Sequence, residues 1–151
     1  MILFVCLGNI CRSPMAEFVM RDLINKEKLT LPVMSAGTGG YHNGEDMHPK
    51  TRAMLCSKQI DPSGFVSKKL TENMCSQARL IIAMDQSNKH DIGRMFPRMK
   101  EKIKLLTDFI PESGYTEVPD PWYTGDFDET YRLVSAACPK ILAEVKGVRI
   151  S

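Results

Sequence analysis

The fold of this chain is decided by the stretch Ile2-Leu3-Phe4-Val5-Cys6-Leu7-Gly8-Asn9-Ile10-Cys11-Arg12-Ser13-Pro14. The run 2–5 is apolar and rich in β-forming residues, which is typical of a buried parallel strand. Ser13 followed by Pro14 favours the start of a helix, with Ser13 as the N-cap and Pro14 in the first turn. A cysteine, a glycine and an arginine therefore lie in a short loop between a strand and a helix N-terminus.

Such a loop can hold a phosphate group, because backbone N–H groups before a helix N-terminus form an anion-binding cavity. Gly8 allows a tight bend, and the guanidinium of Arg12 can hold two phosphate oxygens at once. Cys6 would lie beneath the phosphorus as a thiolate, with a hydrogen bond from Ser13, and form a covalent phosphocysteine. The predicted phosphate-binding residues are Leu7, Gly8, Asn9, Ile10, Cys11, Arg12 and Ser13.

The remaining chain alternates between strands and helices. We expect strands over 31–35, 80–84 and 103–106, helices over 49–58, 87–95 and 127–146, and a loop over 111–125. This alternation predicts an α/β fold, a three-layer sandwich of a parallel sheet between helices. Ligands bind at the carboxyl ends of the strands in such folds, and the Cys6 loop follows a strand.

The segment 6–14 resembles the signature of the low-molecular-weight protein tyrosine phosphatases. Three further segments fall where that family would place them, namely Ser35-Ala36-Gly37-Thr38, Ala83-Met84-Asp85-Gln86-Ser87-Asn88 and Asp120-Pro121-Trp122-Tyr123. The resemblance implies one phosphatase domain over 1–151 and a four-stranded parallel sheet of order 2-1-3-4. Two segments depart from the family pattern. Phe65-Val66-Ser67-Lys68 lacks the family's frequent histidine, and Tyr41-His42-Asn43-Gly44 has tyrosine where bacterial members tend to have tryptophan.

Hydrolysis of an aryl phosphate requires a second functional group, because expulsion of a phenol with a pKa near 10 gains from a general acid. Asp120 is the candidate, first as acid and then as the base that activates water, and Pro121 limits the backbone around it. The aromatic residues Tyr41, Trp122 and Tyr123 are expected to form the walls of a deep slot for a phosphotyrosine ring.

The composition predicts an ordinary globular protein, with 43% hydrophobic residues, 25% charged residues and a net charge of +2. We therefore expect no nucleic-acid or membrane partner, but phosphotyrosine proteins as substrates, oxyanion inhibitors such as phosphate and vanadate, and a monomer. Five irregularly spaced cysteines and three scattered histidines favour neither disulfides nor zinc, so we expect no metal, no cofactor and a cytoplasmic location. Cys11 could form a reversible disulfide with Cys6, and the histidines are interpreted as surface residues.

Three other functions remain open at this point. A thiol-based arsenate reductase shares the loop but needs extra cysteines close together, and Cys75 stands alone in the middle of the chain. A protein arginine phosphatase of the same family would carry threonine in place of Ile10. A phosphotyrosine-binding module would lack a working site, whereas Cys6, Arg12 and Asp120 are all present.

Overall fold

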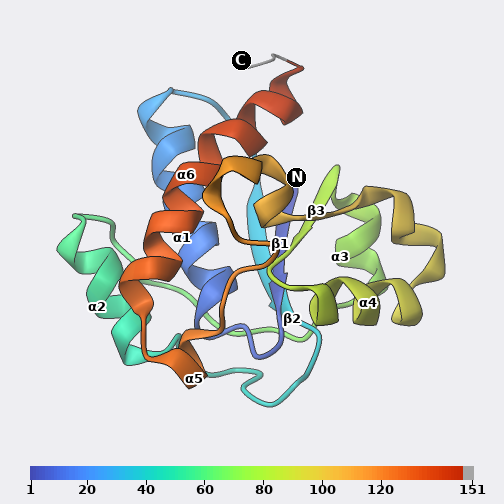
Figure 1. Cartoon of the computed structure of the whole chain (residues 1–151), viewed down its shortest axis with the longest axis horizontal. Coiled ribbons are helices and arrows are strands. Elements are labelled where there is room, and N and C mark those ends of the chain that lie inside the picture. The colour runs from blue at the N-terminus through green and yellow to red at the C-terminus, as the bar shows by residue number, and fades with distance from the viewer. Residues whose placement is uncertain (148–151) are drawn as a thin grey trace.

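The computed structural model describes residues 1–147 and has one four-stranded parallel sheet, in the order β2-β1-β3-β4 (Figure 1). Its strands are β1 (Ile2–Cys6), β2 (Val33–Gly37), β3 (Leu80–Ala83) and β4 (Ile103–Leu105). In the register of the central strand, Cys6 lies opposite Gly37 of β2, and Val5 lies opposite Ala83 of β3. The strand order expected from the resemblance is therefore confirmed.

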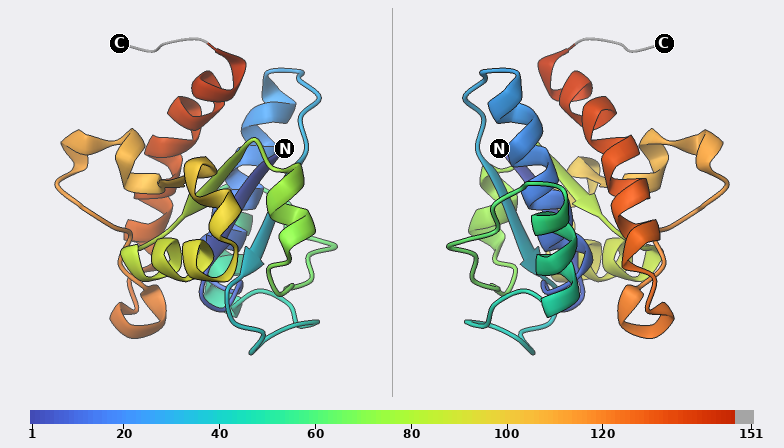
Figure 2. Two further views of the ribbon diagram at one scale, coloured as in Figure 1. Left: turned by 90° about the vertical axis from the view of Figure 1, so that its right-hand side faces the viewer. Right: turned by 90° about the vertical axis from the view of Figure 1, so that its left-hand side faces the viewer.

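Helices cover both faces of this sheet, which confirms the three-layer sandwich (Figures 1 and 2). The α-helices are α1 (Arg12–Lys26), α2 (Pro49–Ser57), α3 (Glu72–Gln77), α4 (Gln86–Met95), α5 (Pro121–Thr124) and α6 (Phe127–Lys146). Three short 3₁₀ helices follow α4, namely η1 (Pro97–Lys102), η2 (Leu106–Phe109) and η3 (Pro111–Ser113). Within residues 1–147 no helix has both the length and the apolar character needed to cross a bilayer.

The alternating side chains of β1 divide the core between the two faces of the sheet. Phe4 and Cys6 point into the cluster that α1, α2 and α6 complete, whereas Leu3 and Val5 point into the cluster that α3 and α4 complete. All residues of β1 are buried, which explains why the strand reads as a continuous apolar run rather than an alternating one. The strand therefore delivers Cys6 to the edge of the larger core.

Several predicted element boundaries were wrong. Helix α1 begins at Arg12 with Cys11 as its N-cap, and no side chain caps it, because the hydroxyl of Ser13 is used inside the phosphate loop. Strand β2 covers Val33–Gly37 rather than 31–35, and the expected loop over 111–125 contains η3 and α5. Helix α3 was not predicted; Thr71 caps it through its side chain.

The end of β2 lies against the loop that follows β1. The backbone N–H groups of Thr38 and Gly39 donate to the carbonyl oxygens of Cys6 (2.9 Å) and Leu7 (3.0 Å). A Cβ atom at Gly37 would lie only 2.7 Å from the Leu7 carbonyl oxygen, so only glycine allows this close approach. The shape of the Cys6 loop is therefore fixed in part by the neighbouring strand.

Candidate active site

Cys6 lies at the carboxyl end of β1, and two donors converge on its sulfur. The backbone N–H of Asn9 donates to Cys6 Sγ (3.3 Å), and Ser13 Oγ lies 2.9 Å from the same sulfur. Ser13 Oγ also accepts a hydrogen bond from Asn9 Nδ2 (2.8 Å), so the hydroxyl hydrogen of Ser13 is left for Cys6 Sγ. This arrangement can hold a negatively charged sulfur in place.

Asn9 holds the loop in shape through its backbone and its side chain. It is fully buried and has a positive φ of 56°, a left-handed conformation that asparagine tolerates better than most residues. Its Nδ2 donates to Ser35 Oγ (2.9 Å), its Oδ1 accepts from the backbone N–H of Lys68 (2.9 Å), and its carbonyl accepts from Ser67 Oγ (2.7 Å). Segments distant in sequence thus brace the loop from behind.

The hydrogen-bond chain continues to a buried carboxyl group that the sequence analysis missed. Ser35 Oγ donates to Glu17 Oε1 (2.5 Å), and Arg21 forms an ion pair with Glu17 Oε2 (2.5 Å). Burial raises the pKa of Glu17, against the opposing effects of the Ser35 hydrogen bond and of the positive charges of Arg21 and Lys68. A signal was present in the sequence, because Glu17 is the one charged residue in the otherwise apolar run 14–20.

Arg12 is almost fully buried, with 2% of its surface exposed, and its two terminal nitrogens have different partners. Nη1 donates to Asp85 Oδ2 (2.7 Å) and to the Val118 carbonyl (3.0 Å), whereas Nη2 makes one long contact with Asp120 Oδ2 (3.4 Å). Burial alone would lower the pKa of Arg12, but the negative charges of Cys6, Asp120 and Asp85 outweigh it and raise that pKa. The anchored guanidinium therefore keeps its charge and presents Nη2 to the pocket.

Asp85 serves two elements with one carboxylate. While Oδ2 accepts from Arg12, Oδ1 accepts from the backbone N–H of Asn88 (2.7 Å) and so caps helix α4. The side chain of Asn88 completes the capping box by accepting from the backbone N–H of Asp85 (3.2 Å). Asp85 therefore anchors the side chain of Arg12 and caps helix α4 at the same time.

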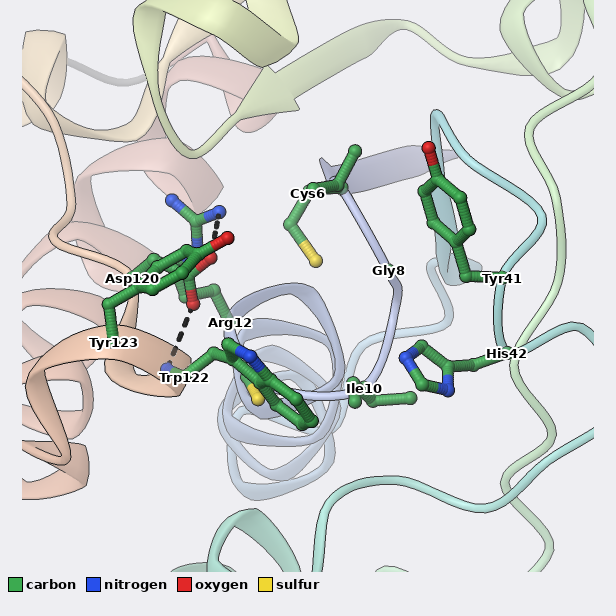
Figure 3. Close-up of a pocket in the computed structure, with 11 residues that line it drawn as sticks. Cys6, Gly8, Ile10, Arg12, Tyr41, His42, Asp120, Trp122 and Tyr123 are labelled. Atoms are coloured by element: carbon green, nitrogen blue, oxygen red, sulfur yellow. Dashed lines mark hydrogen bonds and ion pairs between the residues drawn. The ribbon is translucent and has the colours of Figure 1, made fainter.

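Asp120 is fixed at the start of the short helix α5. Its Oδ1 accepts from the backbone N–H of Trp122 (3.0 Å), and its Oδ2 faces Arg12 (Figure 3). The side chain of Asp120 is 24% exposed, so it can reach both a ligand and solvent. The following residues Trp122 and Tyr123 are 57% and 81% exposed, which is unusual for large aromatic side chains away from a binding site.

These groups surround one cavity of about 220 Å³. Figure 3 shows Tyr41 and His42 on one side of Cys6, and Trp122 and Tyr123 on the other. The lining residues are Cys6, Leu7, Gly8, Ile10, Cys11, Arg12, Tyr41, His42, Asp120, Trp122 and Tyr123. Of the predicted phosphate-binding residues, Asn9 and Ser13 are fully buried and do not line the cavity.

His42 is partly exposed, as expected for a surface residue, and it also forms part of the cavity rim. Its ring lies 6.3 Å from that of Trp122, and a Cβ atom at Gly8 would lie 3.2 Å from its Cδ2. His42 Nδ1 lies 3.3 Å from Glu45 Oε2 at the surface. The sequence could have indicated this rim position, because His42 directly follows Tyr41, which was predicted to form a wall of the cavity.

The thiol of Cys11 is buried near Cys6 and Asp120. Burial, together with the negative charges of Cys6 and Asp120, raises the pKa of Cys11 to about 12. Cys11 is therefore a protonated thiol at neutral pH. Among residues 1–147 no group of three or more His, Cys, Asp or Glu side chains is arranged to hold a metal ion.

Comparisons with known proteins agree with this geometry. Residues 1–149 match the model of the low molecular weight phosphotyrosine protein phosphatases. The low molecular weight protein-tyrosine-phosphatase YfkJ of Bacillus subtilis is 39% identical over 148 residues, 96% of this chain and 95% of that protein. Its crystal structure covers 97% of this chain and 94% of its own, with a TM-score of 0.93.

Two further relatives are similar over nearly their whole length. The low molecular weight protein-tyrosine-phosphatase PtpA of Staphylococcus saprophyticus is 40% identical over 140 residues, 92% of this chain and 89% of that protein. The crystal structure of DARP, a Drosophila arginine phosphatase, has a TM-score of 0.87 and 26% identity, covering 96% of this chain and 97% of that chain. The chain belongs to the low molecular weight phosphotyrosine protein phosphatase family.

Proposed function

We propose that this chain hydrolyses phosphotyrosine in proteins through a covalent phosphocysteine. One observation carries the proposal: Cys6, Arg12 and Asp120 line the same cavity, with exposed aromatic side chains at its rim. A nucleophile, an oxyanion-binding cation and a carboxyl group for proton transfer are the three groups that the two-step hydrolysis of an aryl phosphate requires.

In the first step, the Cys6 thiolate attacks phosphorus, a sulfur–phosphorus bond forms, and the bond from phosphorus to the phenolic oxygen breaks. Arg12 Nη2 and the backbone N–H groups of the loop bind the phosphate oxygens, while Asp85 and Val118 hold Nη1. The phosphate competes with Asp120 for Nη2, and the displaced carboxylate takes up a proton from solvent or from the phosphate monoanion. It then donates that proton to the leaving phenolic oxygen.

In the second step, the Asp120 carboxylate accepts a proton from water, and the water oxygen attacks the phosphocysteine. The sulfur–phosphorus bond breaks and inorganic phosphate leaves. Cys6 is again a thiolate, which accepts hydrogen bonds from the Ser13 hydroxyl and the Asn9 N–H. The capping bond from the Trp122 N–H to Oδ1 keeps Oδ2 directed at the reacting atoms in both steps.

The rim supports an aryl substrate. Trp122 and Tyr123 rise on one side of the cavity and Tyr41 on the other (Figure 3), so a flat phenol ring can enter between them and reach Cys6. A phosphoserine side chain is too short to place its phosphorus on Cys6 while its backbone remains outside these walls. All the groups involved come from one chain, which supports a monomer as the active form.

Arsenate reduction is disfavoured by the positions of the other cysteines. Cys75 is fully buried in the core on the α3 and α4 face, whereas Cys6 and Cys11 belong to the core on the opposite face. Burial also raises the pKa of Cys75 to about 11, so it is a poor relay thiol at neutral pH. Arsenate reduction coupled to thioredoxin by the pure protein would contradict the proposal.

Phosphoarginine is the substrate alternative that deserves a direct test, because one relative of known structure is named an arginine phosphatase. Ile10 lines the cavity with a branched aliphatic side chain, which packs on a phenol ring but offers a guanidinium no hydrogen bond. We expect wild type to prefer phosphotyrosine, and Ile10→Thr to shift the ratio of kcat/KM values towards phosphoarginine. Faster turnover of phosphoarginine by wild type would overturn this assignment.

The proposed function is tested with phosphotyrosine, phosphoserine and p-nitrophenyl phosphate. We expect vanadate-sensitive hydrolysis of the two aryl esters that chelators do not reduce. Cys6→Ser should abolish turnover while still binding vanadate, and Asp120→Ala should lower kcat by about 10² to 10⁴. An Asp120→Ala enzyme that retains full kcat on phosphotyrosine would refute the role of Asp120. Because Cys6 must remain a thiolate, we infer a reducing cytoplasmic setting.

A further inference from the structure

A second cleft, which the proposed chemistry does not use, lies between helix α4 and the 3₁₀ helix η1. It has a volume of about 260 Å³ and is lined by Lys89, His90, Gly93, Arg94, Lys100 and Ile103. Its floor is buried at Gly93 and Ile103, whereas its four ionisable side chains are exposed. No carboxylate lines it, so the cleft is basic throughout.

The positive charge of the chain is concentrated in this region. Residues 89–104 contain six lysines and arginines against two acidic residues, a net charge of +4. Because the whole chain carries only +2, all other residues together carry −2. The segment that forms α4 and η1 is therefore basic, whereas the rest of the chain carries a small net negative charge.

Most of these cations are not neutralised internally. Among the described residues, neither Lys89 nor Lys100 has a carboxylate within 4 Å, and Arg94 has only a long contact with Asp91 (3.6 Å). Lys102 differs, because its Nζ donates to the carbonyl oxygens of Cys75 and Ser76 (3.0 Å each) and so binds the end of α3. Lys102, beside the cleft, therefore has a structural role, whereas Lys89, Arg94 and Lys100 in the cleft can bind a partner.

The cleft adjoins the active site through helix α4. The helix follows Asp85, the residue that anchors Arg12, and runs along the edge of the molecule beyond the carboxyl end of β3 (Figure 1). At about 1.5 Å of rise per residue, Lys89 lies about 6 Å and Arg94 about 14 Å along the helix from Asp85. A protein bound at the catalytic cavity can therefore extend to the cleft.

We propose that this basic cleft binds an acidic segment of the phosphoprotein substrate. This proposal rests on the proposed phosphatase function and adds that the enzyme prefers phosphoproteins with an acidic segment. Exposed lysine and arginine side chains with no internal partner attract an acidic protein over a long range and speed its association. An extended peptide advances about 3.3 Å per residue, so five to ten residues span about 16–33 Å. That reach exceeds the distance of about 6–14 Å between Asp85 and the cleft residues along α4.

The kinetic test compares two phosphotyrosine peptides of equal length, one with a run of glutamates five to ten residues from the phosphotyrosine and one with glutamines there. We expect wild type to show a higher kcat/KM for the acidic peptide, and Lys89→Gln/Arg94→Gln/Lys100→Gln to lose about 10-fold on that peptide alone. Both enzymes should hydrolyse the glutamine peptide and p-nitrophenyl phosphate equally, and added salt should reduce the preference of wild type.

The matched control removes three positive charges elsewhere, as Lys26→Gln/Lys140→Gln/Lys146→Gln. These lysines form surface ion pairs on α1 and α6, which contribute little to stability. The control should keep the wild-type preference for the acidic peptide. An equal loss in both triple variants, or an unchanged preference in the cleft variant, would overturn the proposal.

A second measurement does not depend on catalysis. In a ¹H–¹⁵N NMR titration with an unphosphorylated hexaglutamate peptide, the amide of Gly93 should shift in wild type and stay in place in the cleft variant. Absence of that shift in wild type overturns the proposal, even if phosphotyrosine is hydrolysed. Larger shifts with a DNA oligonucleotide of equal charge would assign the cleft to nucleic acid instead. Failure of wild type to hydrolyse any aryl phosphate would refute the phosphatase function separately.

Discussion

Substitution of Asp85 separates two roles that one carboxylate performs. In wild type, Oδ2 anchors Arg12 Nη1 (2.7 Å) and Oδ1 caps helix α4 (2.7 Å). Asp85→Ala removes both interactions. Asp85→Asn keeps an oxygen for the cap but turns an amide nitrogen towards Arg12, where two donors then face each other. The pair of variants therefore reports the anchor and the cap independently.

The expected magnitudes follow from the burial of the partners. Loss of a helix cap costs about 1 kcal/mol, and loss of one partner of a buried ion pair costs about 3 kcal/mol. Asp85→Ala should therefore lower the free energy of unfolding by about 4 kcal/mol and Asp85→Asn by about 3 kcal/mol, within the 5–15 kcal/mol typical of a domain. Since a hydrogen bond to a charged group contributes about 1.5–3 kcal/mol, kcat/KM should fall about 10- to 150-fold in both variants.

Urea unfolding and p-nitrophenyl phosphate kinetics measure these two effects. Asp91→Asn is the matched control, because Asp91 lies on the same helix and makes only a long surface contact with Arg94. It should change the free energy of unfolding by less than about 0.5 kcal/mol. Wild-type kcat/KM in Asp85→Asn would refute the idea that Asp85 positions Arg12, and equal stability of Asp85→Ala and Asp85→Asn would refute the capping role.

Three further variants test the loop and its support. Ser13→Ala removes the hydroxyl donor to Cys6 Sγ and should lower kcat about 10- to 100-fold in a p-nitrophenyl phosphate assay; an unchanged kcat would show that the hydroxyl is dispensable. Gly37→Ala places a Cβ atom 2.7 Å from the Leu7 carbonyl oxygen and should cost about 1–3 kcal/mol in urea unfolding, whereas an unaltered midpoint would contradict the tight approach. Burial raises the pKa of Glu17, so the folded state favours the protonated carboxyl group. The stability that this protonated group contributes is complete below the unfolded pKa and is lost as the pH rises through the raised pKa. Wild type should therefore lose stability relative to Glu17→Gln as the pH rises above about 4, the usual pKa of an unfolded glutamate. A difference that does not vary with pH would count against a raised pKa.

The functional loop could be predicted from the sequence because its parts are contiguous. The strand, the Gly8 bend, Arg12 and the helix start follow one another within 2–14, so local geometry places them together in any parallel sheet. The family resemblance supplied the strand order and the significance of Asp120. The contacts of Asp85 and Asp120 with Arg12 could not be read from spacing, since more than seventy residues separate each carboxylate from the arginine.

Wrong and missing predictions have a common physical origin in tertiary contacts. Serine is a residue type favoured at helix N-caps. In this structure, however, Ser13 Oγ accepts a hydrogen bond from Asn9, so its one hydroxyl hydrogen is donated to Cys6. Helix α3 was missed because it is six residues long and buries only Cys75, so no helical periodicity marks it. His42 became a rim residue through contacts with Trp122, which lies eighty positions further along the chain.

The anchoring of Arg12 also sets the time at which a newly made chain becomes competent. Its partners Val118 and Asp120 follow it by 106 and 108 residues, so translation at about 5–20 residues per second delays them by about 5–20 s. During that interval Cys6, Arg12 and Asp85 are made, but the guanidinium lacks the Val118 carbonyl and Asp120. A chain that ends before Asp120 therefore lacks both the Val118 anchor of Arg12 and the carboxyl group assigned to proton transfer.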